Sequence, residues 1–193
     1  MQDLAVIPRI LGALFYWPPE SDSVQRLLSS AGEWSQLYSW SDPQAVQTLC
    51  SGLISPGNYP FSVLFEGQGT MEAPPWGSVY QDKDNLLMGV SAVQYHQFLL
   101  ENGLALDSPV NEPDDQFGLM LLAMAALLEQ EKFAAATTLL EQHLLPWAYR
   151  YLERLQRNSV SDFYARLATL AEMFLRDLQT QADLTPASRK LWF

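Results

Sequence analysis

The sequence predicts an all-α protein, a single-domain bundle of about eight to nine helices. Apolar residues recur with the period of a helix along most of the chain, as Ile7, Ile10, Leu11 and Leu14 do near its start. Proline and glycine signals divide the chain into pieces of helix length. No stretch alternates between apolar and polar residues over the length of a strand. With 193 residues, one domain has enough chain to bury a large core.

Local signals delimit the first four expected helices. Pro18 and Pro19 end the first helix, because proline cannot continue it. Asp42 and Pro43 open the third, as an N-cap followed by proline at the first helical position. The four helices are expected at about residues 4–16, 21–28, 42–53 and 60–65, with Ser21 or Asp22 capping the second and Pro60 opening the fourth.

Residues 66–90 are expected to form a loop, because glycines and paired prolines interrupt them. A helix then runs from a cap at Ser91 to Glu101 and is closed by Asn102 and Gly103. A second loop follows, and residues 103–113 are where two lobes of the single domain 1–193 would meet. Four further helices are expected at about residues 114–129, 131–143, 146–157 and 161–182.

The charge is acidic and unevenly placed. The formal net charge is -11, and residues 61–120 hold nine acidic residues and one basic residue, so they carry -8 of it. Only three lysines are present, too few for the basic stripe of an extended nucleic-acid footprint, so no nucleic-acid partner is expected. The acidic middle third is either a solubilising face or a field that attracts a cationic partner.

Cysteine usage and hydropathy indicate a cytoplasmic protein. The single cysteine, Cys50, excludes an intrachain disulfide framework. Asp3 stands where a signal peptide carries basic residues. The nearest apolar run, Phe117 to Leu128, has 12 residues, whereas about 20 are needed to span a bilayer, so no stable membrane insertion is expected.

The sequence carries none of the common catalytic patterns. It has no phosphate-binding glycine loop ending in lysine, no nucleophile elbow and no paired-histidine zinc motif. Its two histidines, His96 and His143, are far apart in the chain, and acidic pairs such as Asp114 and Asp115 are interpreted as caps or solvated charge. We therefore expect no enzymatic activity, no metal and no cofactor.

Two segments have the chemistry of a binding site. In Pro74 to Tyr80, two prolines stiffen the chain beside Trp76, although a tryptophan of this kind can equally fill the core. In Asn111 to Gly118, Glu112, Asp114 and Asp115 precede the long apolar helix, where acids also satisfy the helix N-terminus. Gly118 in the first turn indicates a close approach of another backbone or a ligand. A third segment, His143 to Leu152, is amphipathic and aromatic-rich and is interpreted as mainly core.

Taken in order, these segments resemble the TorD/DmsD family of redox-enzyme maturation chaperones, and within it the DmsD branch. The resemblance extends over nearly the whole chain. The matching stretches are Arg9 to Tyr16, Leu64 and Phe65 with Gly67, Pro74 to Tyr80, Asn111 to Gly118, and His143 to Leu152.

The resemblance implies a site for a leader peptide. Asp115 matches the acid of the family's Glu-Pro-x-Asp-His motif, but Gln116 stands where the family usually has histidine, and it cannot titrate near neutral pH. The leader-binding residues implied are Phe61, Leu64, Phe65, Trp76, Gly77, Ser78, Tyr80, Glu112, Asp114, Asp115 and Gln116.

The resemblance also implies a function. The expected partner is the twin-arginine leader of a molybdenum-cofactor oxidoreductase of the dimethyl-sulfoxide-reductase type, whose export is held back until its cofactor is loaded. The twin-arginine translocon is a second candidate partner. Two arginines followed by an apolar stretch need carboxylates beside an apolar groove, which agrees with the acids and aromatic residues between 61 and 118. The alternative is an assembly adaptor that binds a folded oxidoreductase subunit.

Overall fold

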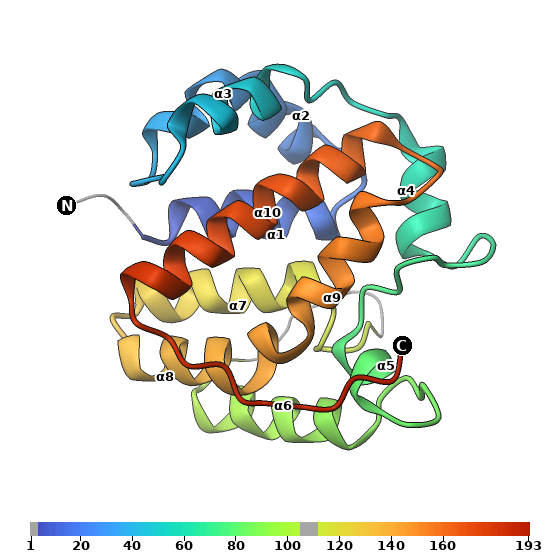
Figure 1. The fold of residues 1–193 in the computed structure, drawn as a ribbon, viewed down its shortest axis with the longest axis vertical. Coiled ribbons are helices and arrows are strands. Elements are labelled where there is room, and N and C mark those ends of the chain that lie inside the picture. The colour runs from blue at the N-terminus through green and yellow to red at the C-terminus, as the bar shows by residue number, and fades with distance from the viewer. Residues whose placement is uncertain (1–3, 105–111) are drawn as a thin grey trace.

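The computed structural model describes residues 4–104 and 112–193, and the all-α prediction is confirmed for them (Figure 1). The single extended pairing among the described residues is an isolated bridge between Trp76 and Gln116. The helical elements are α1 (Val6–Tyr16), α2 (Asp22–Ser29), the 3₁₀ turn η1 (Ala31–Gln36), α3 (Pro43–Ser51), α4 (Asn58–Phe65), α5 (Gly77–Gln81), α6 (Val90–Glu101), α7 (Phe117–Glu129), α8 (Phe133–Thr138), the π-helical turn η2 (Leu139–Leu144), α9 (Leu145–Gln156) and α10 (Asp162–Gln181).

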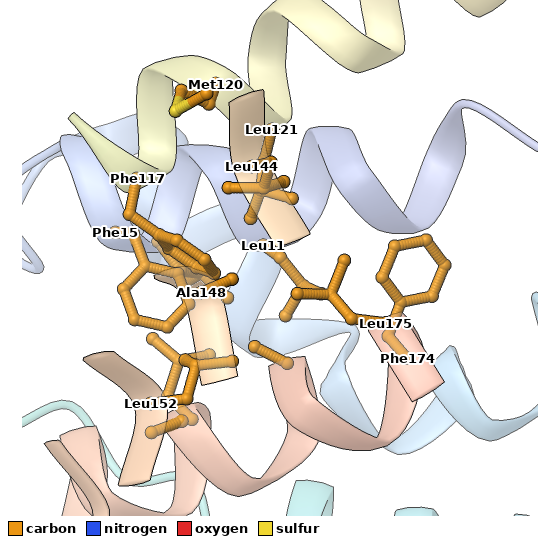
Figure 2. Close-up of a cluster of buried hydrophobic side chains, with 14 of the residues drawn as sticks. Leu11, Phe15, Phe117, Met120, Leu121, Leu144, Ala148, Leu152, Phe174 and Leu175 are labelled. Carbon is orange, nitrogen blue, oxygen red and sulfur yellow. The ribbon is translucent and has the colours of Figure 1, made fainter. Parts of the chain in front are cut away.

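The core forms where α1 packs against α7. Tyr151 of α9 contacts both helices, and α10 packs against α1 and α9. Gly12 of α1 and Gly118 of α7 face each other so closely that a Cβ atom on either would lie 2.8 Å from the other's carbonyl oxygen. The expected close approach at Gly118 is thus to the backbone of α1. Beside it, the rings of Phe15 and Phe117 meet edge to face at 4.9 Å, and Ala148 of α9 lies against them (Figure 2).

The remaining helices surround this core. α2, η1 and α3 pack together at one end, α4 lies to one side of them, and α5, α6 and α8 lie at the other end (Figure 1). Part of the expected meeting point of two lobes, residues 105–111, lies outside the described residues. No helix in the described part of the chain combines the length and the apolar character needed to cross a bilayer.

Several expected helix boundaries are wrong. The predicted loop 66–90 contains α5, whose first turn is satisfied by a carboxylate from a distant segment rather than by a neighbour in the sequence. α6 begins after Gly89, so Ser91 is not its cap, and α4 begins at Asn58 rather than at Pro60. Ser21 occupies the N-cap position of α2 without a capping hydrogen bond, whereas Asp42 accepts one from Ala45 N at 2.9 Å, as expected.

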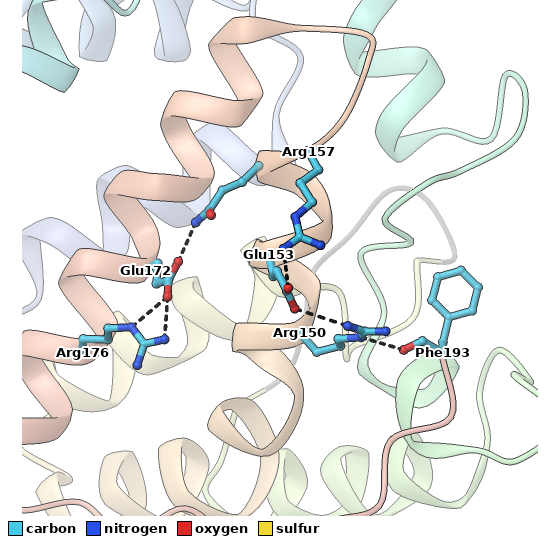
Figure 3. A network of polar contacts seen from close by, with 7 residues as sticks. Arg150, Glu153, Arg157, Glu172, Arg176 and Phe193 are labelled. Carbon is cyan, nitrogen blue, oxygen red and sulfur yellow. Dashed lines mark hydrogen bonds and ion pairs between the residues drawn. The ribbon is translucent and has the colours of Figure 1, made fainter.

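After α10 the chain runs extended across the molecule to α5 (Figure 1). Trp192 N donates to the Tyr80 carbonyl oxygen at 2.8 Å, and Arg150 Nε donates to the Phe193 carbonyl oxygen at 3.2 Å. Glu172 of α10 accepts from Gln156 of α9 at 2.6 Å (Figure 3). These contacts hold the final segment and the two last helices together beneath the site described next.

Candidate functional site

The two segments with binding-site chemistry lie side by side, although nearly forty residues separate them in the chain. Phe117 N donates to the Pro75 carbonyl oxygen at 2.8 Å, and Gly77 N donates to the Asp115 carbonyl oxygen at 3.1 Å. Trp76 and Gln116 form the antiparallel bridge between these two bonds. Backbone pairing therefore fixes both segments as one rigid unit.

Asp115 is the buried link between them. Its Oδ2 atom accepts from Ser78 N at 2.6 Å, so the carboxylate caps α5 from outside that helix. The side chain is 3% exposed, and its Oδ1 atom has no hydrogen-bond partner among the described residues. Burial raises the pKa of Asp115, while hydrogen bonds from Ser78 lower it.

Gln116 is equally buried and serves as the N-cap of α7. Its Oε1 atom accepts from Leu119 N at 2.9 Å, and its Nε2 atom donates to the Phe15 carbonyl oxygen at 3.0 Å. The side chain thus satisfies the first turn of α7 and the last turn of α1 together. The expectation that Asp114 and Asp115 cap this helix is wrong, because α7 begins at Phe117 and Gln116 does the capping.

Glu112 and Trp76 form the outer part of the unit. Trp76 Nε1 donates to Glu112 Oε1 at 2.6 Å, and the indole is only partly buried. Burial raises the pKa of Glu112, and the hydrogen bond from Trp76 opposes that shift. The tryptophan therefore orients a carboxylate at the surface.

A cavity of about 450 Å³ is lined in part by Glu112, and we call it the aromatic cavity. Two carboxylates and several large rings line it, and Gln116 is also part of its wall. Its lining residues are Tyr16, Trp17, Pro18, Phe61, Phe65, Glu66, Glu112 and Gln116.

A second cavity, of about 310 Å³, is also lined by Glu112, and we call it the aliphatic cavity. His96 Nδ1 and Asp114 Oδ2 lie 2.5 Å apart in its wall. Its lining residues are Met88, Ala92, Val93, His96, Glu112, Pro113 and Asp114. Glu112 therefore belongs to both cavities.

The structure divides the expected site residues into two groups. Phe61, Phe65, Glu112, Asp114 and Gln116 line one or both cavities, and Trp76 holds Glu112. The other five lie in the interior beneath the cavities. These are Leu64, Gly77, Ser78, Tyr80 and Asp115.

Packing explains the interior group. A Cβ atom on Gly77 would lie 2.6 Å from Trp147 Nε1, so glycine is required for α5 to pack against α9. Tyr80 stacks on the same indole at 5.4 Å between ring centroids. Trp147, Ala148, Tyr151 and Leu152 are all buried, as expected for the segment from His143 to Leu152.

Most residues of the two cavity walls were not predicted from the sequence. Pro18 was used only as the end of α1 and Trp17 was not considered, although a tryptophan directly before two helix-ending prolines was a signal available in the sequence. Met88, Val93 and His96 gave no pattern, because they belong to an exposed face of α6 and the turn before it. In the described part of the chain, no group of three or more His, Cys, Asp or Glu side chains is placed to hold a metal ion.

The described residues define an all-helical protein with two cavities that share Glu112. A family model described as nitrate reductase delta subunit matches residues 59–153. The Tat proofreading chaperone DmsD of Salmonella typhimurium is 34% identical, with 98% of this chain and 96% of the relative covered. A probable Tat proofreading chaperone DmsD of Haemophilus influenzae is 33% identical over 95% and 93%.

A more distant relative, the chaperone protein TorD of Vibrio cholerae, is 30% identical over 60% of this chain and 57% of its own length. The chain belongs to the TorD/DmsD family of chaperones. The relatives are named chaperones and not enzymes, which confirms the expectation that this chain is not an enzyme.

Proposed function

We propose that this chain is a system-specific Tat proofreading chaperone. It binds the twin-arginine leader of a molybdenum-cofactor oxidoreductase of the dimethyl-sulfoxide-reductase type in the cytoplasm. It holds the precursor back from export until the cofactor is loaded and assembly is complete. The names of its relatives, which are Tat proofreading chaperones, support this proposal.

The composition of the aromatic cavity carries the proposal. Glu66 and Glu112 place two carboxylates beside the rings of Trp17 and Phe61. A guanidinium group pairs with a carboxylate through two parallel hydrogen bonds and stacks on an aromatic face. The cavity offers two carboxylates for paired hydrogen bonds and two rings for stacking, so two adjacent arginines of an extended leader fit it.

The interior group supports this cavity without touching the leader. Asp115 and Ser78 join the two segments that carry Trp76 and Glu112. Leu64 and Tyr80 fill the core beneath the cavity walls. In this proposal the twin-arginine translocon is a further partner, which would meet the chaperone once the leader is released.

Titration calorimetry with synthetic leader peptides tests the proposal. The parent peptide should bind, and replacing its apolar residues with serine should abolish binding. Replacing the arginines with lysines keeps the charge but removes the paired hydrogen bonds and the stacking on the rings, so it should weaken binding measurably. Raising salt from about 0.05 to 0.5 M should weaken binding by less than about tenfold. Binding that survives the serine replacement but is lost at high salt would mean that net charge alone holds the peptide.

The second candidate function is an assembly adaptor that binds a folded oxidoreductase subunit. The name of the matching family model, a nitrate reductase delta subunit, favours it. A pulldown with a precursor that lacks its leader separates the two functions. Loss of binding supports leader recognition, and full retention supports the adaptor.

A further inference from the structure

We propose that the aliphatic cavity and the exposed side chains beside it bind the apolar segment of the leader, while the aromatic cavity holds its arginine pair. The inference rests on the proposed function and assigns a second half to the same site. Glu112 stands between the two halves because it lines both cavities. A leader bound in this way would cross Glu112 at the junction between its arginines and its apolar stretch.

The first observation is a ridge of exposed apolar side chains at the mouth of the aliphatic cavity. Met88 is 61% exposed and Val93 is 64% exposed, and both line the cavity. Together with their neighbours they form what we call the aliphatic ridge. It consists of Leu86, Leu87, Met88, Val90 and Val93.

This ridge is not an unfinished part of the core. α6 buries its other face through Tyr95, Phe98 and Leu99, so the helix is already packed. Contiguous exposed apolar side chains next to a cavity mark an interaction site more often than isolated ones do. The ridge therefore remains available to a partner.

The second observation is that the ridge is held rigidly by the buried unit of the site. Met88 N donates to Ser78 Oγ at 3.2 Å, and Ser78 N donates to Asp115. Met88 has a φ of 60°, a left-handed conformation that is uncommon for a bulky residue and is found where surrounding structure enforces it. Asn85, with a φ of 54°, is fixed by a bond from its Nδ2 atom to the Val79 carbonyl oxygen at 2.9 Å.

The third observation identifies the occupant. The same cavity is also lined by the carboxylates of Glu112 and Asp114, with His96 paired to Asp114. An apolar segment that enters this cavity must belong to a chain whose neighbouring residues are cationic. A leader in which an apolar stretch directly follows two arginines meets both conditions, whereas a purely apolar peptide would bring no opposite charge to the two carboxylates.

Affinity measurements on ridge variants give the first test. Val93→Asp should weaken binding of the parent leader peptide at least tenfold, because it places a carboxylate against an apolar segment beside two existing acids. The unfolding midpoint should not change, since Val93 is exposed. The matched control is Phe133→Asp on α8, which is 56% exposed and lines neither cavity, and it should leave the affinity unchanged.

Site-directed photocrosslinking gives the second test. A photoreactive amino acid in place of Val93 should crosslink to the apolar residues of the bound leader, and one in place of Trp17 should crosslink next to its arginines. Mass spectrometry of the crosslinked peptides reads out both positions.

The possible outcomes separate this inference from the proposed function. If the leader binds but position 93 gives no crosslink, or Val93→Asp binds as tightly as the parent, the assignment of the apolar segment is overturned and leader binding stands. If the leader does not bind the parent protein at all, both proposals fail. Crosslinks from position 93 to the apolar residues together with the affinity loss support the two-part site.

Discussion

Asp115 and Gln116 are each 3% exposed, whereas Glu112 and Asp114, one to four residues earlier in the same acidic segment, are only partly buried and line the two cavities. Gln116 also lines the aromatic cavity, but both polar atoms of its side chain are hydrogen-bonded inside the protein. The first pair satisfies backbone groups of α5, α7 and α1. The second pair presents carboxylates to a partner. Residues of similar chemistry thus have two different tasks within five positions.

The segment from Pro74 to Tyr80, which pairs with the acidic segment, shows the same division between buried and partly exposed residues. Trp76 lies partly exposed and holds Glu112, while Ser78, two residues later, is fully buried and holds Met88. Changes in the inner residues, which are buried and bond backbone groups, should therefore reduce stability. Changes in the outer residues, which are partly exposed, should reduce affinity for the leader. The following predictions test that separation.

The largest effect is expected from Gly118→Ala, in the inner part. The added Cβ atom would lie 2.8 Å from the Gly12 carbonyl oxygen and 3.0 Å from the Phe15 carbonyl carbon, both backbone atoms that cannot move aside. We expect a loss of about 3 kcal/mol in the free energy of unfolding, measured by urea denaturation.

Gly32→Ala is the control for Gly118→Ala. Nothing lies within 4 Å of a Cβ atom at Gly32, so this variant should be close to neutral. Equal stability of the two alanine variants would show that α1 and α7 do not cross as closely as the structure places them.

The next largest effect concerns the outer part. Trp76→Ala should weaken leader binding by about 2 kcal/mol or more, in the range of an interfacial aromatic anchor, because it removes an apolar surface and releases Glu112. Trp76→Phe keeps a ring but loses the hydrogen bond to Glu112, so it should lie between the parent and the alanine variant. Unchanged affinity combined with early melting of Trp76→Ala would make this residue part of the core.

A smaller effect is expected from Asp115→Asn, and it depends on pH. The amide can still accept from Ser78 N, so at pH 7 the free energy of unfolding should change by no more than about 1 kcal/mol. Burial raises the pKa of Asp115 above its usual 3.8, so the folded state holds the proton more tightly than the unfolded state. The stability of the parent relative to Asp115→Asn should therefore be greatest at acid pH and fall as pH rises through that raised pKa.

Urea titrations at several pH values measure this dependence. Asp115→Ala is the companion variant, because it leaves Ser78 N without a partner in the interior and should cost about 1–3 kcal/mol. A relative stability that instead rises with pH would mean that Asp115 is held as a charged group by a partner.

Helices that are marked by residues within their own sequence could be predicted, whereas a helix that depends on a distant residue could not. α1, α7 and α10 show helical periodicity and clear ends, and all three form close to the expected positions. α5 could not be predicted, because the acid that satisfies its first turn is 37 residues away. A short helix that depends on a tertiary contact has no local signature.

The same reasoning applies to the site. Phe61 and Phe65 were predicted as binding residues through the resemblance, and both line the aromatic cavity. Trp17 was missed because the aromatic cavity is assembled from three separate segments of the chain, so no local pattern marks its lining residues. The side chains of the aliphatic ridge were missed because they are exposed and do not follow the helical repeat of apolar residues that marks a core.

The smallest effect is expected from Gln116→His, which restores the residue usual in the family. A neutral imidazole has one donor and one acceptor nitrogen, so it can replace both bonds of Gln116, to the Phe15 carbonyl oxygen and from Leu119 N. Leader affinity at pH 8 should therefore stay within about threefold, which is well under 1 kcal/mol.

Acid pH should distinguish this variant from the parent. The protonated imidazole has two donors and no acceptor, so it cannot accept from Leu119 N, and the cap of α7 is lost at a cost of about 1 kcal/mol. The folded state then disfavours the proton, and the stability of Gln116→His should fall as pH drops below about 6.5, the ordinary histidine pKa. Denaturation at pH 8 and pH 5.5, with calorimetry at pH 8, measures both effects. A tenfold loss of affinity at pH 8 without loss of stability would mean that Gln116, which lines the aromatic cavity, contacts the leader directly in addition to capping α7.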